Sequence, residues 1–426
     1  MKIYIEPNPS DWEAILKRPT LDTSALESTV QAILEEVQAR GDQAVIEYTA
    51  RFDKVELNQL AVTASEIQAA AAQLPEDLKQ AIQQAKANIE QFHRQQAHQE
   101  PEVETMQGVR CWRKSLPIEK VGLYIPGGTA PLFSTVLMLG VPAKIAGCKE
   151  IVLCSPPQAD GTIHPAILYT AQLVGVTKIF KAGGVQAVAG MAYGTESIPA
   201  TYKIFGPGNQ YVTAAKQLVN RAGIAIDMPA GPSEVLVLAD TSADSAFVAA
   251  DLLSQAEHGV DSQVVLVAFA ETTVQAVQAE VERQLMDLPR REIAIAALEN
   301  SVAVVVKEES TALRLINTYA PEHLILSMDN ARAFAEGIIN AGSVFLGHYT
   351  PESVGDYASG TNHTLPTNGF AKAYSGVSLD TFVKKVTFQE LTKEGLQQLG
   401  PVVERMAEAE QLMAHKNAVS LRLQKL

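Results

Sequence analysis

From Lys120 onward, short runs of strand-forming residues alternate with longer helix-forming runs, and this alternation constrains the fold more than any other feature. It is typical of βαβ units, in which parallel strands form a sheet that helices cover on both faces. The sequence therefore predicts a parallel sheet in this part of the chain. The expected strands are Val121–Ile125, Ile151–Cys154, Lys178–Lys181, Lys203–Phe205 and Ile224–Asp227, and the expected helices are Leu132–Ala146, Pro165–Leu173, Gln186–Tyr193 and Tyr211–Asn220.

The alternation resumes after an A-G-P-S-E loop at 230–234, which predicts a second α/β unit. Residues from about 23 to 97 have apolar positions at helical spacing and few strand formers, so this region is expected to be helical. The tail from about 402 to 426 is expected to form one charged amphipathic helix. The predicted fold class is α/β, with two parallel-sheet domains, a helical N-terminal region and a C-terminal helical tail. The strands expected in the second unit are Val235–Leu238, Val264–Phe269, Ala303–Val306 and Ser343–Leu346.

The charge balance limits the partners that this chain of 426 residues can bind. A net charge of −14 argues against nucleic acid and anionic membranes, which attract basic surfaces. The first residues lack the apolar core of a signal peptide, and no charge-free apolar run is long enough for a transmembrane helix. Three cysteines do not form a disulfide framework or a Cys-rich zinc motif. We therefore expect a cytoplasmic enzyme with no nucleic-acid or membrane partner.

Glycine-rich loops follow several of the expected strands, at the position where open α/β sheets bind ligands. They read I-P-G-G-T at 125–129, A-G-G-V-Q at 182–186 and G-P-G-N-Q at 206–210, and each precedes a helix N-terminus suited to phosphate. None matches the G-x-G-x-x-G fingerprint with a following acidic ribose anchor. The loops are therefore compatible with dinucleotide binding and equally with simple tight turns.

The stretch from Asp251 to Asp261 reads D-L-L-S-Q-A-E-H-G-V-D and contains a candidate metal-binding pair. An apolar-periodic run leads into it, so Gln255 and His258 are expected in the last turn of a helix that Gly259 ends. Being three positions apart, the Gln255 oxygen and a His258 ring nitrogen share one helical face. Imidazole and oxygen donors suit zinc or another divalent first-row metal. Taken alone, however, Q-x-x-H more often marks a polar helix end that faces water.

Further ligands and proton acceptors have to come from other parts of the chain. Asp356 lies in an expected glycine-rich loop, where its alternative role is to form a turn. The adjacent Glu322 and His323 supply two bases for a reaction with two proton abstractions, or else a polar pair at a helix end. Cys148 and Cys154 are expected to be core thiols. The histidines considered for a site are His258, His323, His363 and His415, whereas His93 and His98 are expected on a solvated face.

Seven stretches, in this order along the chain, resemble those of the histidinol dehydrogenase family. They are V-G-L-Y-I-P-G-G-T-A-P-L-F-S-T-V-L-M, F-G-P-G-N-Q-Y-V-T-A-A-K, A-G-P-S-E-V-L-V, S-Q-A-E-H-G, Y-A-P-E-H-L, G-D-Y-A-S-G-T-N-H-T-L-P-T and the tail around His415. The resemblance covers essentially the whole chain. It implies a zinc-containing, NAD-dependent enzyme of histidine biosynthesis, which oxidises L-histidinol through an enzyme-held aldehyde to L-histidine and reduces two NAD molecules.

The resemblance also implies an architecture. The family has two incomplete Rossmann-like domains, which accounts for the missing nucleotide fingerprint. It forms a homodimer with one zinc ion per subunit, in which the C-terminal tail completes the partner's site. The boundaries expected here are an N-terminal extension at 1–22, a first α/β domain with the zinc and catalytic residues at 23–118 plus 234–365, a NAD-side domain at 119–233, and a C-terminal extension at 366–426.

Matching positions carry the family's roles over to individual residues of this chain. The zinc ligands would be Gln255, His258, Asp356 and His415, and the catalytic pair would be Glu322 and His323. The substrate contacts would include Ser233, His363 and Glu410, together with the four zinc ligands and His323. The NAD contacts would be Tyr124, Gln186 and Asn209.

Two other functions remain open on the sequence. An aldehyde dehydrogenase that acts through a covalent thiol ester would use Cys148 or Cys154 as its nucleophile. A zinc-binding protein without redox turnover would keep the metal ligands, but it would produce no NADH from histidinol.

Overall fold

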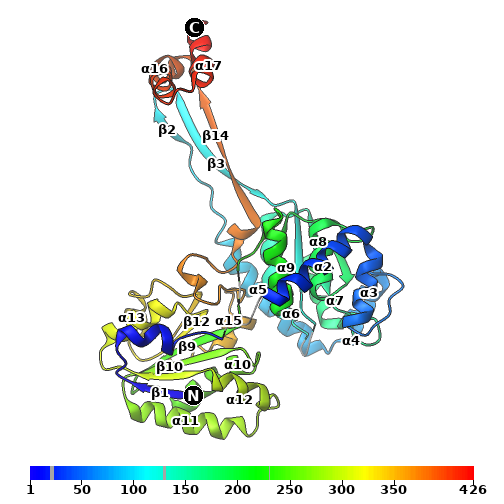
Figure 1. The fold of residues 1–426 in the computed structure, drawn as a ribbon, viewed down its shortest axis with the longest axis vertical. Helices are drawn as coiled ribbons and strands as arrows, with labels where there is room; N and C mark the ends of the chain where they lie inside the picture. Colours follow the sequence, from blue (N-terminus) through cyan, green and yellow to red (C-terminus); the bar gives the residue numbers. More distant parts are fainter. Residues whose placement is uncertain (20–23, 128–130, 230) are drawn as a thin grey trace. The chain divides into compact units, whose positions relative to one another are not determined.

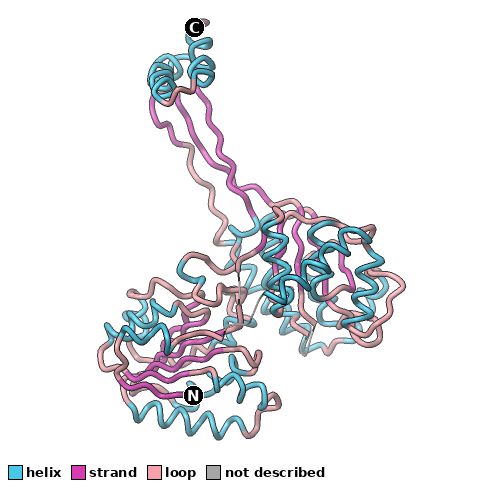
Figure 2. Tube along the Cα trace, viewed as in Figure 1, coloured by secondary structure: helices cyan, strands magenta, loops and turns pink. Residues whose placement is uncertain are grey.

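The computed structural model describes residues 1–19, 24–127, 131–229 and 231–426. The chain divides into two compact units, one formed by Met1–Arg94 and Ile118–Phe382 and the other by Gln95–Pro117 and Val383–Leu426. From β4 onward, helices and parallel strands largely alternate along the larger unit, as predicted (Figures 1 and 2). The predicted I-P-G-G-T loop is described as far as Gly127, and Ala230 of the A-G-P-S-E loop lies outside the described residues.

The larger unit contains a parallel sheet, sheet A, whose six described strands run in the order β1-β11-β10-β9-β12-β13. Helices α10, α11 and α12 pack on one face of it, and α1, α13 and α14 pack on the other. Successive residues of β9 point alternately into these two cores, as the period of a strand requires. The strands are β1 (Lys2–Ile5), β9 (Glu234–Ala239), β10 (Gln263–Ala268), β11 (Val302–Val305), β12 (His323–Ser327) and β13 (Ser343–Leu346), and the helices are α1 (Trp12–Ile15), α10 (Ser245–Ala256), α11 (Glu271–Leu285), α12 (Arg291–Glu299), α13 (Glu309–Tyr319) and α14 (Ala331–Ala335).

A second parallel sheet, sheet B, has the described strand order β6-β5-β4-β7-β8. Its helices cover both faces, which confirms the predicted fold class of two parallel-sheet α/β domains. The strands are β4 (Lys120–Tyr124), β5 (Glu150–Ser155), β6 (Lys178–Lys181), β7 (Lys203–Phe205) and β8 (Ala225–Ile226), and the helices that follow them are α6 (Phe133–Ala146), α7 (Pro165–Val174), α8 (Gly184–Tyr193) and α9 (Gln210–Arg221).

The N-terminal helices share their buried side chains with sheet B. Helices α4 and α5 pack with α6 and α7, and helices α2 and α3 pack with α8 and α9. The expected boundaries grouped residues 23–118 with 234–365, whereas these helices bury their apolar faces against residues of the 119–233 range. The four helices are α2 (Ser24–Arg40), α3 (Asp42–Phe52), α4 (Ala64–Gln73) and α5 (Glu76–Arg94).

Several local expectations are wrong. His93 is fully buried, because it lies on the same face of α5 as Ile82 and Ile89, and its Nδ1 lies 2.8 Å from the Ile89 carbonyl. Asp356 lies on a short helix, α15 (Glu352–Tyr357), where a loop was expected. The edge strand β1 and the strand β12, which begins with the polar His323, were not expected.

The smaller unit consists of an antiparallel sheet and two helices. Strands β2 (Val103–Met106), β3 (Val109–Pro117) and β14 (Val383–Leu391) are ordered β14-β3-β2. The tail forms α16 (Lys393–Ala409) and α17 (Met413–Leu423), and not one continuous helix. The helix breaks at Gln411, whose φ of 61° lies in the left-handed region and so ends the helical hydrogen bonding. Among the described helices, none combines the length and the apolarity that crossing a bilayer requires.

Candidate functional site

Strands β9 and β12 begin side by side at one edge of sheet A. Their register pairs His323 with Val235, so Glu322 lies level with Glu234 where the strands start. Helix α10 follows β9 and runs back toward this edge, as crossover helices do, and its last turn carries Gln255. The candidate residues therefore gather at the amino edge of the sheet, although open α/β sheets usually bind ligands at the carboxyl edge.

His323 lies at the centre of this cluster and is almost completely buried. Its Nε2 lies 3.3 Å from Asp356 Oδ1, so the structure brings a predicted base and a predicted metal ligand into contact. Its Nδ1 lies 3.3 Å from the carbonyl oxygen of Glu234 and 3.6 Å from Glu322 Oε2. Both ring nitrogens of His323 therefore have oxygen neighbours.

Carboxylates around His323 control its pKa. Burial disfavours the charged ring, but attraction from Glu352 and Glu322 and the hydrogen bond to Asp356 outweigh burial and hold the pKa of His323 well above its usual value. Burial acts to raise the pKa of Asp356, but the hydrogen bond and the charge of His323 outweigh it and lower that pKa overall. Both shifts favour the charged forms of His323 and Asp356, whose side chains lie 3.3 Å apart.

Gln255 and Glu352 face each other in the interior, each with 1% of its surface exposed. With its amide oriented so that both groups are paired, Gln255 donates to Glu352 Oε1 at 2.5 Å and accepts from the Glu234 N–H at 3.0 Å. Burial raises the pKa of Glu352 to about 8. Its second oxygen, Oε2, is buried and has no hydrogen-bond partner among the described residues. An orphaned acidic oxygen of this kind points to a missing cationic or donor group.

The structure places a second set of potential metal ligands at the same point. His323, Glu352 and Asp356 each offer one ligand atom, and these atoms lie within 4.8 Å of one another. This set shares only Asp356 with the four predicted zinc ligands. Sequence reasoning missed Glu352, although it stands four positions before Asp356 and so shares its face of α15.

The other predicted residues of this region are Ser233, His258 and His363, which lie just before β9, just after α10 and after α15, respectively. His258 is exposed just after the end of α10, with Nδ1 2.9 Å from the Ser254 carbonyl, and its charge contributes to the lowered pKa of Asp356. His363 Nδ1 lies 2.9 Å from the Asp356 carbonyl, and its Nε2 lies 3.2 Å from Thr135 Oγ1. Ser233 immediately precedes β9 and is half-buried.

Two predicted site residues belong to the smaller unit. Glu410 is the residue that ends α16, and His415 lies on α17. Both side chains are exposed in the single chain. Their proposed roles in substrate and zinc binding therefore stay predictions.

The predicted NAD contacts lie at the carboxyl edge of sheet B, where one of them ends a strand and the other two follow strands. Tyr124 ends β4, and its hydroxyl accepts a hydrogen bond from the Gly184 N–H at 3.1 Å. Asn209 follows β7 and caps α9, with its Oδ1 3.1 Å from the backbone nitrogens of Tyr211 and Val212. Gln186 lies in the first turn of α8 and is 1% exposed, yet neither of its amide atoms has a partner among the described residues. An unpaired buried amide is costly, so its presence points to a ligand.

The two cysteines that a thiol mechanism would need are unsuited to it. Cys148 is 7% exposed and Cys154 is fully buried. Burial raises the pKa of Cys148 to about 12 and also raises the pKa of Cys154 far above its usual value. Both side chains therefore behave as core thiols, as expected.

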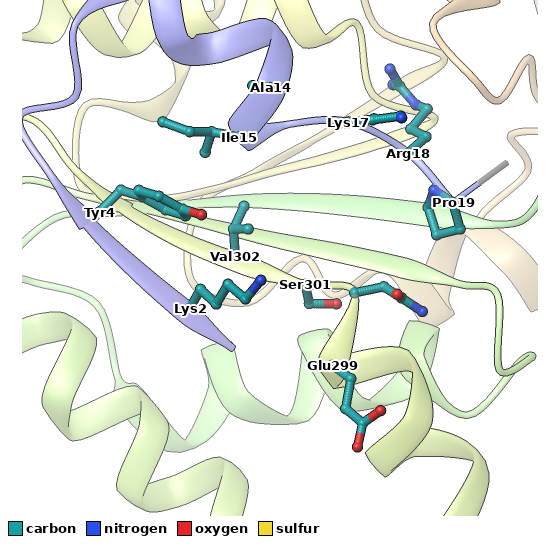
Figure 3. Close-up of a pocket in the computed structure, with 11 residues that line it drawn as sticks. Lys2, Tyr4, Ala14, Ile15, Lys17, Arg18, Pro19, Glu299, Ser301 and Val302 are labelled. Carbon is teal, nitrogen blue, oxygen red and sulfur yellow. The ribbon is translucent and has the colours of Figure 1, made fainter.

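A cavity of about 310 Å³ lies beside β1, and none of the predicted site residues lines it. Figure 3 shows Lys2, Lys17, Arg18, Glu299 and Ser301 among the residues around it. Arg18 is the residue that matters for the site, because its guanidinium donates to Glu234 at the start of β9. Sequence reasoning missed both Arg18 and Glu234; the only local signal was the acidic end of A-G-P-S-E.

The fold and the cluster define a two-sheet α/β protein with a buried acid–imidazole cluster at one end of sheet A. The family model described as "Histidinol dehydrogenase" matches residues 16–423. Histidinol dehydrogenase of Bacteroides thetaiotaomicron is 64% identical over 426 residues and covers 100% of both chains. The chain therefore belongs to the histidinol dehydrogenase family, which confirms the resemblance found in its motifs.

Two further relatives extend the comparison. "Histidinol dehydrogenase, chloroplastic" of Arabidopsis thaliana is 53% identical over 428 residues, which is 99% of this chain and 91% of that protein. The crystal structure of histidinol dehydrogenase from Elizabethkingia anophelis matches with a TM-score of 0.97 at 55% identity, covering 100% of this chain and 98% of that one. The similarity therefore includes both units of the fold.

Proposed function

We propose that the protein oxidises L-histidinol through enzyme-held L-histidinal to L-histidine, in a zinc- and NAD-dependent four-electron reaction that completes histidine biosynthesis. The observation that carries the proposal is the 3.3 Å contact between His323 Nε2 and Asp356 Oδ1, which joins a proposed proton acceptor to a proposed metal ligand. Membership of the histidinol dehydrogenase family supports the choice of substrate.

The proposed zinc ligands are Gln255, His258, Asp356 and His415 of the partner subunit. The donor set fits a divalent metal, because it combines imidazole nitrogens with amide and carboxylate oxygens. The unpaired Oε2 of the buried Glu352, which contacts Gln255, supports a cation in this place. Bound zinc would supply an anchor for the ring nitrogen and the amine of the substrate, which fixes the carbinol carbon.

The protein's own residues would move the protons. His323 accepts the substrate's hydroxyl proton in the first oxidation, and Glu322 then activates the water that adds to the aldehyde. His323 accepts the hydrate's proton in the second oxidation. Neighbouring carboxylates raise the pKa of His323. A cation bound to Asp356 would offset their charge and lower this pKa, so the neutral ring could accept a proton at neutral pH. Burial of the pair supports retention of the reactive aldehyde.

The proposed NAD contacts are Tyr124, Gln186 and Asn209. Their support is that all three lie at the carboxyl edge of sheet B and that the buried Gln186 amide lacks a partner among the described residues. NAD would accept one hydride in each oxidation. Residues 119–233 would form the NAD side, and the domain formed by residues 23–118 plus 234–365 would carry the zinc and catalytic residues.

We also propose a homodimer with one zinc per subunit and shared active sites. Residues 366–426 would reach the partner's site, where Glu410 contacts the substrate together with Ser233 and His363 of the other chain. The protein is proposed to be cytoplasmic and to have no nucleic-acid or membrane partner, consistent with its net charge of −14.

The decisive experiment follows absorbance at the NADH band with histidinol and NAD, before and after chelation. We expect two NADH per histidinol and loss of activity when the metal is removed, with recovery on adding zinc. One NADH per histidinol with free aldehyde accumulating would contradict the four-electron reaction. No NADH at all would favour a zinc-binding protein without redox turnover.

The thiol route makes an opposite prediction for the cysteines. A double Cys148→Ser, Cys154→Ser variant should keep its activity, because both thiols are buried and have raised pKa values. Loss of activity in the folded variant would favour an aldehyde dehydrogenase that uses a thiol ester.

A further inference from the structure

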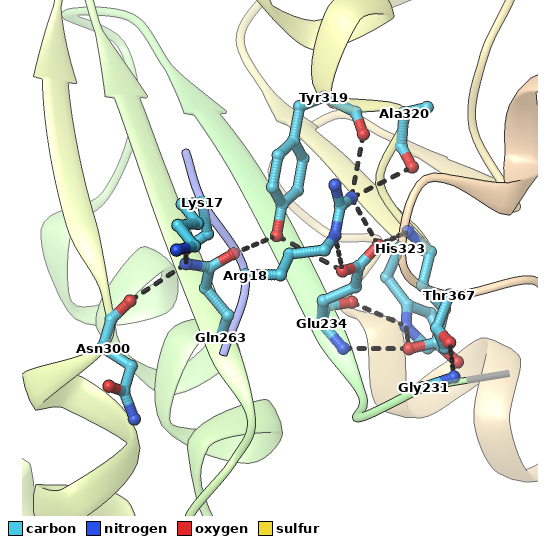
Figure 4. A network of polar contacts seen from close by, with 11 residues as sticks. Lys17, Arg18, Gly231, Glu234, Gln263, Asn300, Tyr319, Ala320, His323 and Thr367 are labelled. Atoms are coloured by element: carbon cyan, nitrogen blue, oxygen red, sulfur yellow. Dashed lines mark hydrogen bonds and ion pairs between the residues drawn. The ribbon is translucent and has the colours of Figure 1, made fainter. Parts of the chain in front are cut away.

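Glu234 contacts both members of the proposed catalytic pair, Glu322 and His323. Figure 4 shows Glu234 between Arg18 and His323. Its backbone N–H is shared between the Gln255 amide oxygen at 3.0 Å and Glu322 Oε2 at 2.9 Å, and its side-chain Oε1 accepts from the Glu322 N–H at 3.2 Å. Its carbonyl oxygen lies 3.3 Å from His323 Nδ1. One residue that is 2% exposed therefore holds a carboxylate and an imidazole at the same time.

The carboxylate of Glu234 is itself held by Arg18, which follows α1. Arg18 Nε donates to Glu234 Oε2 at 2.5 Å, and Nη2 donates to Oε1 at 2.8 Å. Two parallel bonds to one carboxylate fix its plane, which a lysine cannot do. The guanidinium carbon also lies 3.9 Å from the centroid of the Tyr319 ring, so a cation–π contact helps to fix the guanidinium plane.

Arg18 also reaches the turn that leads into the catalytic pair. Its Nη2 donates to the Tyr319 carbonyl at 2.8 Å, at the end of α13 where a cation is favourable. Ala320 then adopts the left-handed region with φ of 55°, and β12 begins at His323. The same guanidinium thus holds Glu234 on one side of Glu322 and the preceding turn on the other.

We propose that Glu234 is a positioning residue for the Glu322–His323 pair and that Arg18 holds Glu234 in its working position. The inference rests on the proposed function, which makes this pair the proton acceptors. Neither Arg18 nor the Glu234 side chain is assigned a contact with substrate. They act by fixing where β9 and β12 begin, and a displacement of about 1 Å in a catalytic group costs on the order of 100-fold in rate.

The first test compares Arg18→Met and Arg18→Lys with the wild-type enzyme loaded with zinc. We expect kcat of Arg18→Met to fall by more than about tenfold while KM changes by less than about threefold, because the chemistry and not the binding is disturbed. The kcat of Arg18→Lys should lie between those of wild type and Arg18→Met, because lysine keeps the positive charge but cannot form both hydrogen bonds to the carboxylate. Arg314→Met is the matched control: Arg314 lies over the Trp12 ring at 5.4 Å and so also ties α1 to α13, without contacting Glu234.

The cavity beside Arg18 permits a rescue experiment. Truncation in Arg18→Ala would extend this cavity toward Glu234, so added ethylguanidinium has a route to the vacated site. We expect it to raise kcat several-fold over the same concentration of sodium chloride. A residue that only stabilised the fold would show a lower melting temperature and no such recovery.

Hydrogen exchange supplies a readout that does not depend on activity. The peptide covering residues 319–326 should exchange faster in Arg18→Met than in wild type or Arg314→Met. If wild type oxidises no histidinol, the proposed function fails, and exchange still tests whether Arg18 fixes this turn. An unchanged kcat or an unchanged exchange rate in folded Arg18→Met overturns the proposal. If that variant does not fold, the same two criteria apply to Arg18→Lys.

Discussion

Glu352 Oε1 accepts a hydrogen bond from the side-chain nitrogen of Gln255 at 2.5 Å, with both residues buried. This contact fixes how a proposed zinc ligand presents its amide. Partners that orient a ligand in this way typically contribute 10- to 100-fold in metal affinity. We therefore expect Glu352→Gln to bind zinc on the order of 10-fold more weakly, as measured by competition with a chelator. Glu257→Gln, next to the same helix end, is the control, and equal affinity in all three proteins would exclude this role.

The two proposed catalytic residues, Glu322 and His323, should differ in which half-reaction they serve. Glu322→Gln is expected to slow the aldehyde oxidation more than the alcohol oxidation, because only the second step needs activated water. His323→Asn should slow both steps, since each needs a proton acceptor. Single-turnover runs started from histidinol and from histidinal separate the steps. Equal losses for Glu322→Gln in the two runs would refute this division of roles.

The proposed sharing of His415 between subunits is testable by mixing inactive variants. His258→Asn and His415→Asn each remove one proposed zinc ligand, and they are refolded together. In a mixed dimer one site carries both lesions and the other carries none, so random pairing should restore roughly a quarter of the wild-type sites. If each tail serves its own chain, the mixture stays inactive even when subunit exchange is confirmed separately.

Stability should depend on pH through Asp251. Burial raises its pKa from 3.8 to about 7. The folded chain therefore holds a proton that the unfolded chain releases, so this group lowers stability as pH rises from about 4 to 7 and keeps that penalty above 7. Asp251→Asn cannot ionise, and we expect it to be more stable than wild type at pH 8 by on the order of 2 kcal/mol, after allowing for partial exposure. Urea unfolding should show a smaller gain at pH 5; an equal gain at both values would assign the effect to packing.

The Gln186 side chain should lower the stability of the fold and raise the affinity for NAD. Its buried amide atoms lack partners among the described residues, which costs about 1–3 kcal/mol. Gln186→Met keeps the size and removes the polar atoms, so we expect a higher melting temperature together with weaker NAD binding by calorimetry. The exposed Gln172→Met serves as the control for the change of residue type. Unchanged NAD affinity in Gln186→Met would remove this residue from the proposed cofactor contacts.

Much of the fold was predictable because parallel strands buried on both faces are continuous apolar runs. Each expected strand of sheet B overlaps an observed strand. In sheet A, the expected strand Val235–Leu238 lies within β9. The failures have local causes. Strand β12 begins with His323, a polar residue that hides its start, and Gly355 made the helix carrying Asp356 resemble a loop. His93 was predicted on a solvated face because its neighbours in sequence are polar. Its helical face is apolar, so the side chain is buried.

The members of the cluster could be predicted where they are adjacent in sequence or lie in a motif of the family. Glu322 and His323 are adjacent, and the motifs of the family place Asp356 with them. Arg18 and Glu234 are 216 positions apart, and no periodicity connects them. Such a pair depends on the register of β9 and β12 and on the path of the segment after α1, which only the folded chain defines.

The proposed catalytic cluster occupies the amino edge of sheet A, which leaves the opposite edge free of the proposed chemistry. The turn at 241–243, between β9 and α10, belongs to that opposite edge, and Thr241 and Ser242 are exposed there. Loop tips of this kind accept added sequence. The turn is therefore a suitable attachment point for a reporter or an immobilisation tag. It lies at the carboxyl ends of the strands, so an insertion there should disturb neither the proposed substrate site nor the Arg18–Glu234 pair.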